Sequence, residues 1–180
     1  MEFRLAAIFS DNCVLQRRKN IAVFGTGPEG CLVEACIRGR RMEQGQEQES
    51  RGKTVVRDGR FKLQLPPLEA GLEHVLQVNC GEESICLRNI AIGEVWLAGG
   101  QSNMEYELQN CTESDALNRP ADDQIRFYYT QKKAYMDEDF FRSERQSGWE
   151  CFGDNGTRYW SAVGYFFALR LQKELGVPVG

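Results

Sequence analysis

Within Gly93-Glu94-Val95-Trp96-Leu97-Ala98-Gly99-Gly100-Gln101-Ser102-Asn103-Met104-Glu105, an apolar run passes through two glycines and reaches a serine between two amide residues. The residues from Ile90 to Leu97 are nearly all apolar, which is typical of a strand buried on both faces of a parallel sheet. A strand that stops at glycines and presents a hydroxyl at its carboxyl end is a common way to build a nucleophile site in an α/β protein. We therefore predict that an α/β domain begins near residue 90, with Trp96 in its core and Ser102 as the candidate nucleophile.

The residues before this segment consist of short strand patterns separated by turn residues. Asp58-Gly59 between two apolar runs predicts a type I′ hairpin, because that turn needs positive φ at both central residues. The polar stretch from Met42 to Gly52 is expected to be an exposed hairpin loop. The expected strands are Arg4–Ile8, Cys13–Gln16, Ile21–Phe24, Leu32–Ile37, Lys53–Arg57, Phe61–Leu65, His74–Asn79 and Ser84–Ile92. Residues 1–89 are therefore predicted to form an N-terminal β-sandwich domain.

The residues after Ser102 alternate between helix and strand patterns. The clearest helix starts after Ser161, whose hydroxyl can cap it, and ends before Gly176, which fits a left-handed position. The other expected elements are a short helix at Asn103–Leu108, a strand at Gln124–Tyr129, an irregular stretch at Lys132–Asp154 and the start of a strand at Val177–Gly180. The sequence thus predicts an all-β part followed, over residues 90–180, by the first part of an α/β domain.

The composition is that of an ordinary globular protein and argues against several function classes. The 180 residues carry a net charge of −4, with no dense basic patch apart from Arg38–Arg41, so nucleic acid is not an expected partner. No apolar run approaches the roughly 20 residues that a membrane span needs, and the N-terminus lacks the pattern of a signal peptide. The seven cysteines include no C-x-x-C pair. We therefore expect reduced thiols in a cytoplasmic protein, and neither a metal nor a cofactor.

Ser102 is the leading candidate for chemistry. A serine hydroxyl is a poor nucleophile until a base, usually a histidine oriented by a carboxylate, removes its proton. The turn differs from the G-x-S-x-G elbow of α/β-hydrolases, because Met104 occupies the position of the final glycine. A serine after two glycines also occurs as a residue that only shapes a turn. The wider sequence therefore has to decide whether Ser102 is a nucleophile or a turn residue.

Three segments of the chain resemble the sialate O-acetylesterase family, a branch of the SGNH (GDSL-like) hydrolases related to bacterial acetylxylan esterases. The segments are Ile8–Gln16, Gly93–Glu105 and Trp160–Gly180, which together reach from one end of the chain to the other. The departures are Cys13 where Met is usual, Ala98-Gly99 in place of Cys-Ser, and Tyr106 where Trp is frequent. The resemblance implies a β-sandwich followed by the N-terminal part of an α/β/α SGNH-hydrolase domain of flavodoxin-like type, truncated at its C-terminal side.

The resemblance also implies roles for residues of the turn. Ser102 would be the acyl-accepting nucleophile, and its backbone N–H would form part of the oxyanion hole. Gln101 stands where the wider superfamily has an aspartate and would brace the turn by hydrogen bonding, as would Asn103 and Glu105. Helix capping and surface solvation are the alternative roles of those three residues. The implied substrate is an acetylated carbohydrate, either sialic acid or acetylxylan, and no metal would be needed.

The chain contains a single histidine, His74, which precedes Ser102 and lies in a strand pattern. We expect His74 at the surface and outside any triad. The family's catalytic Asp-x-x-His belongs to a later block, which these 180 residues do not contain. Because losing a triad member lowers the rate by roughly 10⁴-fold, we expect negligible esterase activity from this chain alone. An incomplete sheet leaves an open edge, which favours self-association or a complementing C-terminal chain as partner.

A non-catalytic carbohydrate-binding or interaction module built on the β-sandwich is the alternative function. Aromatic side chains can stack on sugars in either function, and the candidates are Trp96, Trp149, Tyr159 and Trp160. Glycan binding that does not need Ser102 would favour the module, whereas Ser102-dependent hydrolysis would favour the enzyme.

Overall fold

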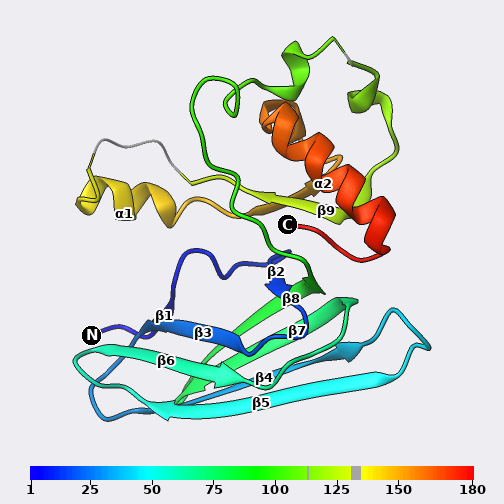
Figure 1. The fold of residues 1–180 in the computed structure, drawn as a ribbon. Coiled ribbons are helices and arrows are strands. Elements are labelled where there is room, and N and C mark those ends of the chain that lie inside the picture. The colour runs from blue at the N-terminus through cyan, green and yellow to red at the C-terminus, as the bar shows by residue number, and fades with distance from the viewer. Residues whose placement is uncertain (113, 131–134) are drawn as a thin grey trace.

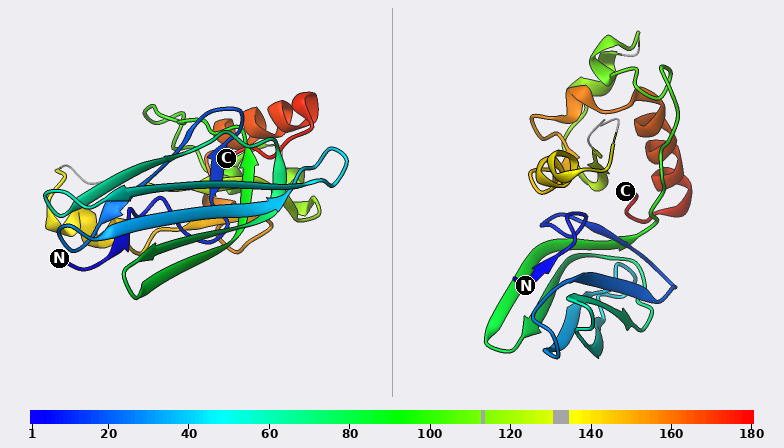
Figure 2. Two further views of the ribbon diagram at one scale, coloured as in Figure 1. Left: turned by 90° about the horizontal axis from the view of Figure 1, so that it is seen from below. Right: turned by 90° about the vertical axis from the view of Figure 1, so that its left-hand side faces the viewer.

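The computed structural model describes residues 1–112, 114–130 and 135–180. The N-terminal residues build a half made of strands, and the C-terminal residues build a half that mixes helices and strands (Figure 1). The two halves lie one above the other in the right-hand view of Figure 2. The buried apolar side chains correspondingly form two clusters, one mainly within residues 3–92 and one within residues 108–165.

The first half contains two sheets. Its strands are β1 (Arg4–Leu5), β2 (Val14–Gln16), β3 (Ile21–Thr26), β4 (Leu32–Arg40), β5 (Glu47–Val55), β6 (Arg60–Leu65), β7 (Gly71–Cys80) and β8 (Glu83–Gly93). One sheet has the order β1-β3-β6 and the other the order β2-β8-β7-β4-β5, and all pairs are antiparallel except the parallel pair of β2 with β8. Alternation along β6 places Phe61, Leu63 and Leu65 in the core, as a strand with one buried face requires.

The hairpin turn predicted at Asp58-Gly59 in this half is confirmed. Asp58 and Gly59 both have positive φ, at 53° and 69°, as the predicted hairpin between β5 and β6 requires. The loop predicted at Met42–Gly52 is wrong in its second half, because β5 already begins at Glu47. Gln48 and Ser50 point inward there, and their side chains donate to the carbonyls of Glu69 and Pro66, each at 2.8 Å. Polar residues can therefore line a buried strand face when their hydrogen bonds are satisfied.

A disulfide links Cys31, just before β4, to Cys80 at the end of β7. The expectation that all cysteines are reduced thiols is therefore wrong for this pair. β4 and β7 are neighbours in the five-stranded sheet, and the Cα atoms of the two cysteines lie 6.1 Å apart, within the range that a disulfide spans. The free cysteines are Cys13, Cys36, Cys86, Cys111 and Cys151. The compartment in which the protein works stays a prediction.

The second half contains three parallel segments and a fourth antiparallel one. Its elements are η1 (Leu108–Asn110), η2 (Ser114–Asn118), β9 (Asp122–Tyr128), α1 (Glu138–Glu144), β10 (Trp149–Phe152), η3 (Thr157–Tyr159) and α2 (Ala162–Leu175). Residues 178–180 lie between residues 94–96 and β9: Glu94 N–H donates to the Pro178 carbonyl at 2.8 Å, and Val179 N–H donates to the Gln124 carbonyl at 2.8 Å. β10 pairs antiparallel with β9. The strand prediction for Gln124–Tyr129 is thus confirmed as β9, whereas Val177–Gly180 makes isolated parallel bridges at Val179 and no complete strand.

The predicted ends of α2 are also confirmed. The Ser161 hydroxyl accepts a hydrogen bond from Gly164 N–H at 3.1 Å, and Gly176 adopts φ of 63°. None of the helices among the described residues is long and apolar enough to cross a membrane.

Two other helix expectations differ from the structure. The stretch expected to be irregular contains β10 and also α1, which is capped by Asp137 through a hydrogen bond from Phe140 N–H at 3.0 Å; its residues 132–134 lie outside the described residues. The short helix predicted at Asn103–Leu108 does not form. Leu108 N–H donates instead to the Trp160 carbonyl at 2.9 Å, so tertiary pairing takes the place of the helical bond.

The strand predicted at Ile90–Leu97 is only partly buried. Ile90 and Ile92 are fully buried, and β8 runs unbroken through the predicted domain boundary at residues 89–90, which stays a prediction. Beyond Gly93 the chain becomes exposed, with 54% of Trp96 and 97% of Leu97 accessible to solvent. The core position expected for Trp96 is therefore wrong. Among the described residues, only residues 178–180 and a few side chains pair with this segment, so its other side is left open.

Candidate functional site

Ser102 lies in an exposed turn that follows the pairing of residues 94–96 with residues 178–180. The turn is closed by two backbone hydrogen bonds, from Met104 N–H and Glu105 N–H to the Gln101 carbonyl, at 2.9 and 3.1 Å. The side chains of Gln101, Ser102 and Asn103 are exposed and make no hydrogen bond to another residue in the described parts of the chain. The three predicted site residues, which are adjacent in sequence, thus share one exposed turn. The bracing role of Gln101 and Asn103 stays a prediction.

The residues after Ser102 are fixed to the start of α2. The Ser161 hydroxyl contacts the Met104 sulfur at 3.2 Å, and Ala162 N–H donates to the Tyr106 carbonyl at 2.8 Å. Ser161 therefore serves both as the cap of α2 and as a contact of the turn. Trp160, one residue earlier, donates its indole N–H to Glu150 at 2.9 Å.

The residues before Ser102 are fixed to the N-terminal segment. Arg17 Nε donates to Glu94 Oε1 at 2.7 Å, and Gln16 Nε2 donates to Glu94 Oε2 at 3.0 Å. Gln16 Oε1 also accepts a hydrogen bond from Val95 N–H at 2.9 Å. Burial acts to raise the pKa of Glu94, but the hydrogen bonds from Arg17 and Gln16 hold this pKa below its ordinary value. We refer to Gln16, Arg17 and Glu94 as the carboxylate clamp.

A buried arginine joins the two halves of the molecule. The guanidinium of Arg126, on β9, donates to the carbonyls of Asn12 (2.9 Å), Asn89 and Asp123 (2.7 Å) and to the side chain of Asn89 (3.2 Å). Asn12 and Asn89 have positive φ, at 66° and 54°, and the Asn89 amide donates to Asn12 Oδ1 at 2.7 Å. We refer to Arg126, Asn12 and Asn89 as the arginine latch.

The N-terminal segment also contacts β8 and β10. Asp11 accepts a hydrogen bond from Arg88 N–H at 2.7 Å, and Ser10 accepts one from Trp149 N–H at 3.2 Å. The segments Ile8–Gln16, Gly93–Glu105 and Trp160–Gly180 are therefore in direct contact, and they meet at the strand and turn that carry Ser102. The clamp and the latch were not predicted, although Gln16, Asn12 and Glu94 lie inside two of those segments. Sequence pattern alone does not reveal which side chains of two such segments are partners.

The comparisons with known proteins agree with this convergence. The chain is 29% identical to human sialate O-acetylesterase over 195 residues and 27% identical to the mouse protein over 194 residues, in each case over 99% of this chain. The chain is a homologue of the N-terminal part of the sialate O-acetylesterases. It spans only 35% of the mouse protein and 36% of the human protein. No family model matches.

A solved structure supports the same relationship. The chain superposes on a carbohydrate acetylesterase from Xanthomonas citri with a TM-score of 0.77 and 27% sequence identity, over 98% of this chain and 38% of that protein. Over almost all of its residues, the chain therefore shares the fold of part of this carbohydrate acetylesterase.

The single histidine of the chain, His74, lies on β7 inside the five-stranded sheet, in the half of the molecule that does not carry Ser102. The expectation that His74 is at the surface is wrong, because the residue is fully buried. Its Nε2 accepts a hydrogen bond from the Gln48 amide at 2.9 Å, and burial lowers the pKa of His74 to about 4. A side chain at Gly39 or Gly71 would come within 2.4 Å of the imidazole ring, so the glycines make room for it. His74 is a packed core residue.

The aromatic candidates for sugar stacking fall into two groups. Trp149 and Trp160 are buried, whereas 54% of Trp96 and 57% of Tyr159 are accessible to solvent. Trp96 packs edge-on against Phe167 of α2, with ring centroids 5.2 Å apart. No group of three or more His, Cys, Asp or Glu residues that could hold a metal occurs among the described residues.

Proposed function

We propose that this chain is the nucleophile-bearing N-terminal part of a serine carbohydrate O-acetylesterase. The observation that carries the proposal is the convergence of three separate segments on the strand and turn of Ser102. The carboxylate clamp holds the residues before the turn, and Ser161 and Ala162 hold those after it. Exposure of Ser102 leaves its hydroxyl accessible to a sugar ester.

The proposal includes a finer description of the fold. We assign residues 1–89 to a β-sandwich and residues 90–180 to the beginning of an α/β/α SGNH-hydrolase domain. Two sheets around one apolar cluster support the first assignment. The parallel pairing of residues 94–96, 178–180 and β9, together with α2, supports the second.

In the proposed reaction the Ser102 oxygen attacks the carbonyl carbon of an acetyl ester on a sugar hydroxyl. The proton of Ser102 passes to a base, the sugar oxygen leaves with a proton, and water then hydrolyses the acetyl-enzyme to acetate. The backbone N–H of Ser102 would stabilise the oxyanion. The chain holds one histidine, and His74 is buried in the other half of the molecule, so the base has to come from outside these 180 residues.

A complementing polypeptide is therefore the proposed partner, with self-association as the alternative. Such a partner would cover a group of exposed apolar residues. These are Val163 and Phe167 on α2, and Val95, Trp96 and Leu97 in the neighbouring strand segment. Without it, the chain should be less active than the complete enzyme by roughly 10⁴-fold or more.

The test is acetate release from 9-O-acetylated sialic acid and from acetylxylan. The chain is assayed alone and mixed with the C-terminal part of human sialate O-acetylesterase, the part that this chain does not match, and the Ser102→Ala variant is the control. We expect hydrolysis only in the mixture and only with Ser102 present. Ser102-dependent turnover by the chain alone would refute the need for a second polypeptide.

A non-catalytic carbohydrate-binding module is the second candidate, and the exposure of Trp96 and Tyr159 favours it. Its test is glycan binding by the Ser102→Ala, Trp96→Ala and Tyr159→Ala variants. Binding that survives Ser102→Ala and is lost in Trp96→Ala or Tyr159→Ala would support the module, whereas binding unchanged in both aromatic variants would contradict it.

A further inference from the structure

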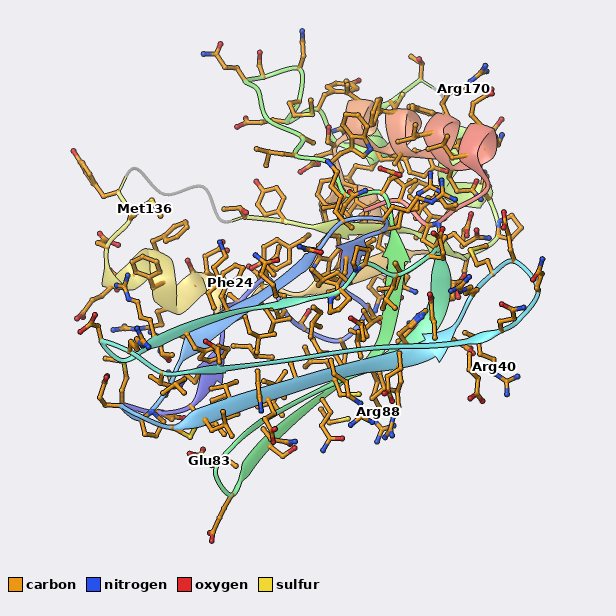
Figure 3. All side chains as sticks on the ribbon, turned by 60° about the horizontal axis from the view of Figure 1, so that its bottom comes forward. Phe24, Arg40, Glu83, Arg88, Met136 and Arg170 are labelled. Carbon is orange, nitrogen blue, oxygen red and sulfur yellow. A yellow bond between two sulfur atoms is a disulfide. The ribbon has the colours of Figure 1, made fainter. Side chains whose placement is uncertain are left out.

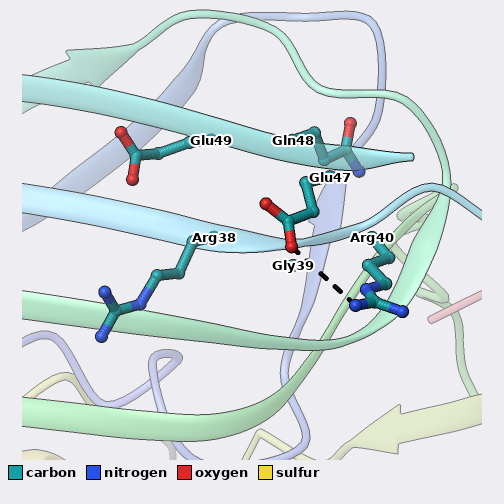
Figure 4. A pocket seen from close by; sticks show the side chains of 6 residues that line it. All are labelled: Arg38, Gly39, Arg40, Glu47, Gln48 and Glu49. Atoms are coloured by element: carbon teal, nitrogen blue, oxygen red, sulfur yellow. Dashed lines mark ion pairs between the residues drawn. The ribbon is translucent and has the colours of Figure 1, made fainter. Parts of the chain in front are cut away.

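Two surface hollows of the described residues are lined by pairs of arginines, and they differ in the number of acidic residues beside those arginines. The larger hollow, of about 460 Å³, lies at the open end of the β4–β5 hairpin. Figure 4 shows Arg38 and Arg40 there beside Glu47 and Glu49. Arg40 pairs with Glu47 at 3.8 Å, whereas Glu49, which is opposite Arg38 in the strand register, pairs with Arg51 at 2.5 Å. The residues that line this hollow carry two positive and two negative charges.

The smaller hollow, of about 200 Å³, lies in the other half, between the end of η2 and the loop that follows β10. Its lining residues are Leu117, Arg119, Phe152, Gly153, Asp154, Asn155, Thr157 and Arg158. The hollow is thus lined by two arginines, which come from separate segments, and by one acidic residue.

The positive charges of the smaller hollow are not matched. No ion pair among the described residues includes Arg119 or Arg158. Arg119 interacts with the hydroxyl of Tyr165, a neutral group whose pKa is raised by burial and lowered in part by this arginine. The carboxylate of Asp154 already accepts a hydrogen bond from Cys151 N–H at 2.8 Å. The residues that line the hollow therefore carry two positive charges and one negative charge.

The walls of the hollow are held by short hydrogen bonds. Gly153 N–H donates to the Thr157 hydroxyl at 3.0 Å, and Thr157 N–H donates to the Asp154 carbonyl at 3.0 Å. Gly153 adopts φ of 107°, and a Cβ at this position would lie 2.6 Å from the Cβ of Ala121. These contacts restrict the loop, which lowers the entropy that a ligand would have to remove.

We propose that the hollow between Arg119 and Arg158 is a binding site for a small organic anion that bears a carboxylate or phosphate group. A guanidinium group presents paired N–H donors that match the two oxygens of such an anion. Leu117 and Phe152 supply apolar surface for the carbon skeleton of the ligand. The volume of about 200 Å³ is small for a ligand site and matches a molecule no larger than about a monosaccharide. This site is separate from the function proposed for Ser102 and does not depend on it.

The test is a titration of the isotopically labelled full chain, followed by the amide resonances of Gly153 and Gly156. The probes are inorganic phosphate, glucuronate and, as the neutral control, glucose. We expect saturable shifts with both anions at millimolar concentration and none with glucose. Tighter binding of glucuronate than of phosphate would identify a sugar acid as the ligand, whereas equal binding would identify the oxyanion alone.

Variants locate the site. Arg158→Gln and Arg119→Gln should each weaken binding by about tenfold or more, because each removes a charge-assisted pair of hydrogen bonds. Arg170→Gln is the matched control, since Arg170 lies on the outside of α2 and pairs with Glu174 at 2.7 Å (Figure 3). If Arg119→Gln does not fold, owing to its contact with Tyr165, Arg158→Gln decides. No saturable shift with either anion, or equal weakening by Arg158→Gln and Arg170→Gln, would overturn the proposal.

Discussion

Gln16 Oε1 accepts a hydrogen bond from the backbone N–H of Val95 at 2.9 Å, across 79 positions of the sequence. The same side chain donates to Glu94 at 3.0 Å. Gln16 belongs to the N-terminal segment and Val95 to the segment that carries Ser102. Through this contact, the N-terminal segment helps to position the segment that carries Ser102.

Gln16→Ala should lower the free energy of unfolding by about 1–2 kcal/mol, because it leaves Val95 N–H and the Glu94 carboxylate without these partners. The amide of Val95 should also exchange faster with solvent, which hydrogen exchange measures directly. Gln46→Ala is the control, since Gln46 lies in the exposed turn between β4 and β5. Unchanged exchange at Val95 in Gln16→Ala would contradict the positioning role of the clamp.

Arg126→Met should destabilise the protein by about 3 kcal/mol, since the carbonyls of Asn12 and Asn89 would lose a buried donor. Because the latch joins the two halves, unfolding by urea should also become a two-step process. Arg170→Met, on the exposed face of α2, should change neither quantity. A single transition with an unchanged midpoint in Arg126→Met would show that the halves are held together by other contacts.

Ser161→Ala should lower the stability by about 1 kcal/mol, the usual loss for an N-cap. Ser161→Asp keeps an acceptor for Gly164 N–H and should restore most of that stability in thermal unfolding. The contact with Met104 is not restored by aspartate. Faster exchange of the Met104 amide in both variants, compared with the unchanged protein, would therefore separate the turn contact from the capping effect.

The stability of the protein should fall as the pH drops from about 6.5 to about 4. The pKa of His74 is lowered by burial to about 4, whereas the unfolded chain has the ordinary value of about 6.5. The unfolded state therefore binds the extra proton in this window, and the His74 contribution, up to about 3 kcal/mol, is lost as the pH falls. The imidazole resonances of the folded protein should stay those of the neutral form at pH 5. A His74 titration midpoint near 6.5 in the folded state would contradict this result.

Local signals predicted much of the fold. Asp58-Gly59, Ser161 and Gly176 act through their own backbone geometry and immediate neighbours, and each lies where the sequence places it. Gln48 and His74 were misplaced because their burial depends on partners distant in sequence: the Gln48 amide donates to Nε2 of the imidazole of a residue 26 positions away. Because both side chains are polar, the sequence predicts them at the surface. Only the contact with a partner distant in sequence explains why they are buried.

The sequence predicted where in the chain the candidate site lies, but not which residues contact one another there. The glycines before Ser102 correctly predict an exposed turn, but the open side of the preceding strand leaves Trp96 in solvent instead of in a core. The latch binds mainly backbone carbonyls, which every residue carries, and the clamp joins side chains that are 77 and 78 positions apart in the sequence. No local sequence pattern therefore marks either of them in advance.

The most direct test of the account is the detection of an acetyl group on Ser102. The chain is mixed with the C-terminal part of human sialate O-acetylesterase and an O-acetylated sugar, quenched with acid, digested and analysed by mass spectrometry. We expect acetylation of the peptide that contains Ser102, its absence in the Ser102→Ala variant, and no acetylation at Ser161. Acetate release that proceeds equally in Ser102→Ala, without acetylation of Ser102, would contradict the assignment of Ser102 as the nucleophile.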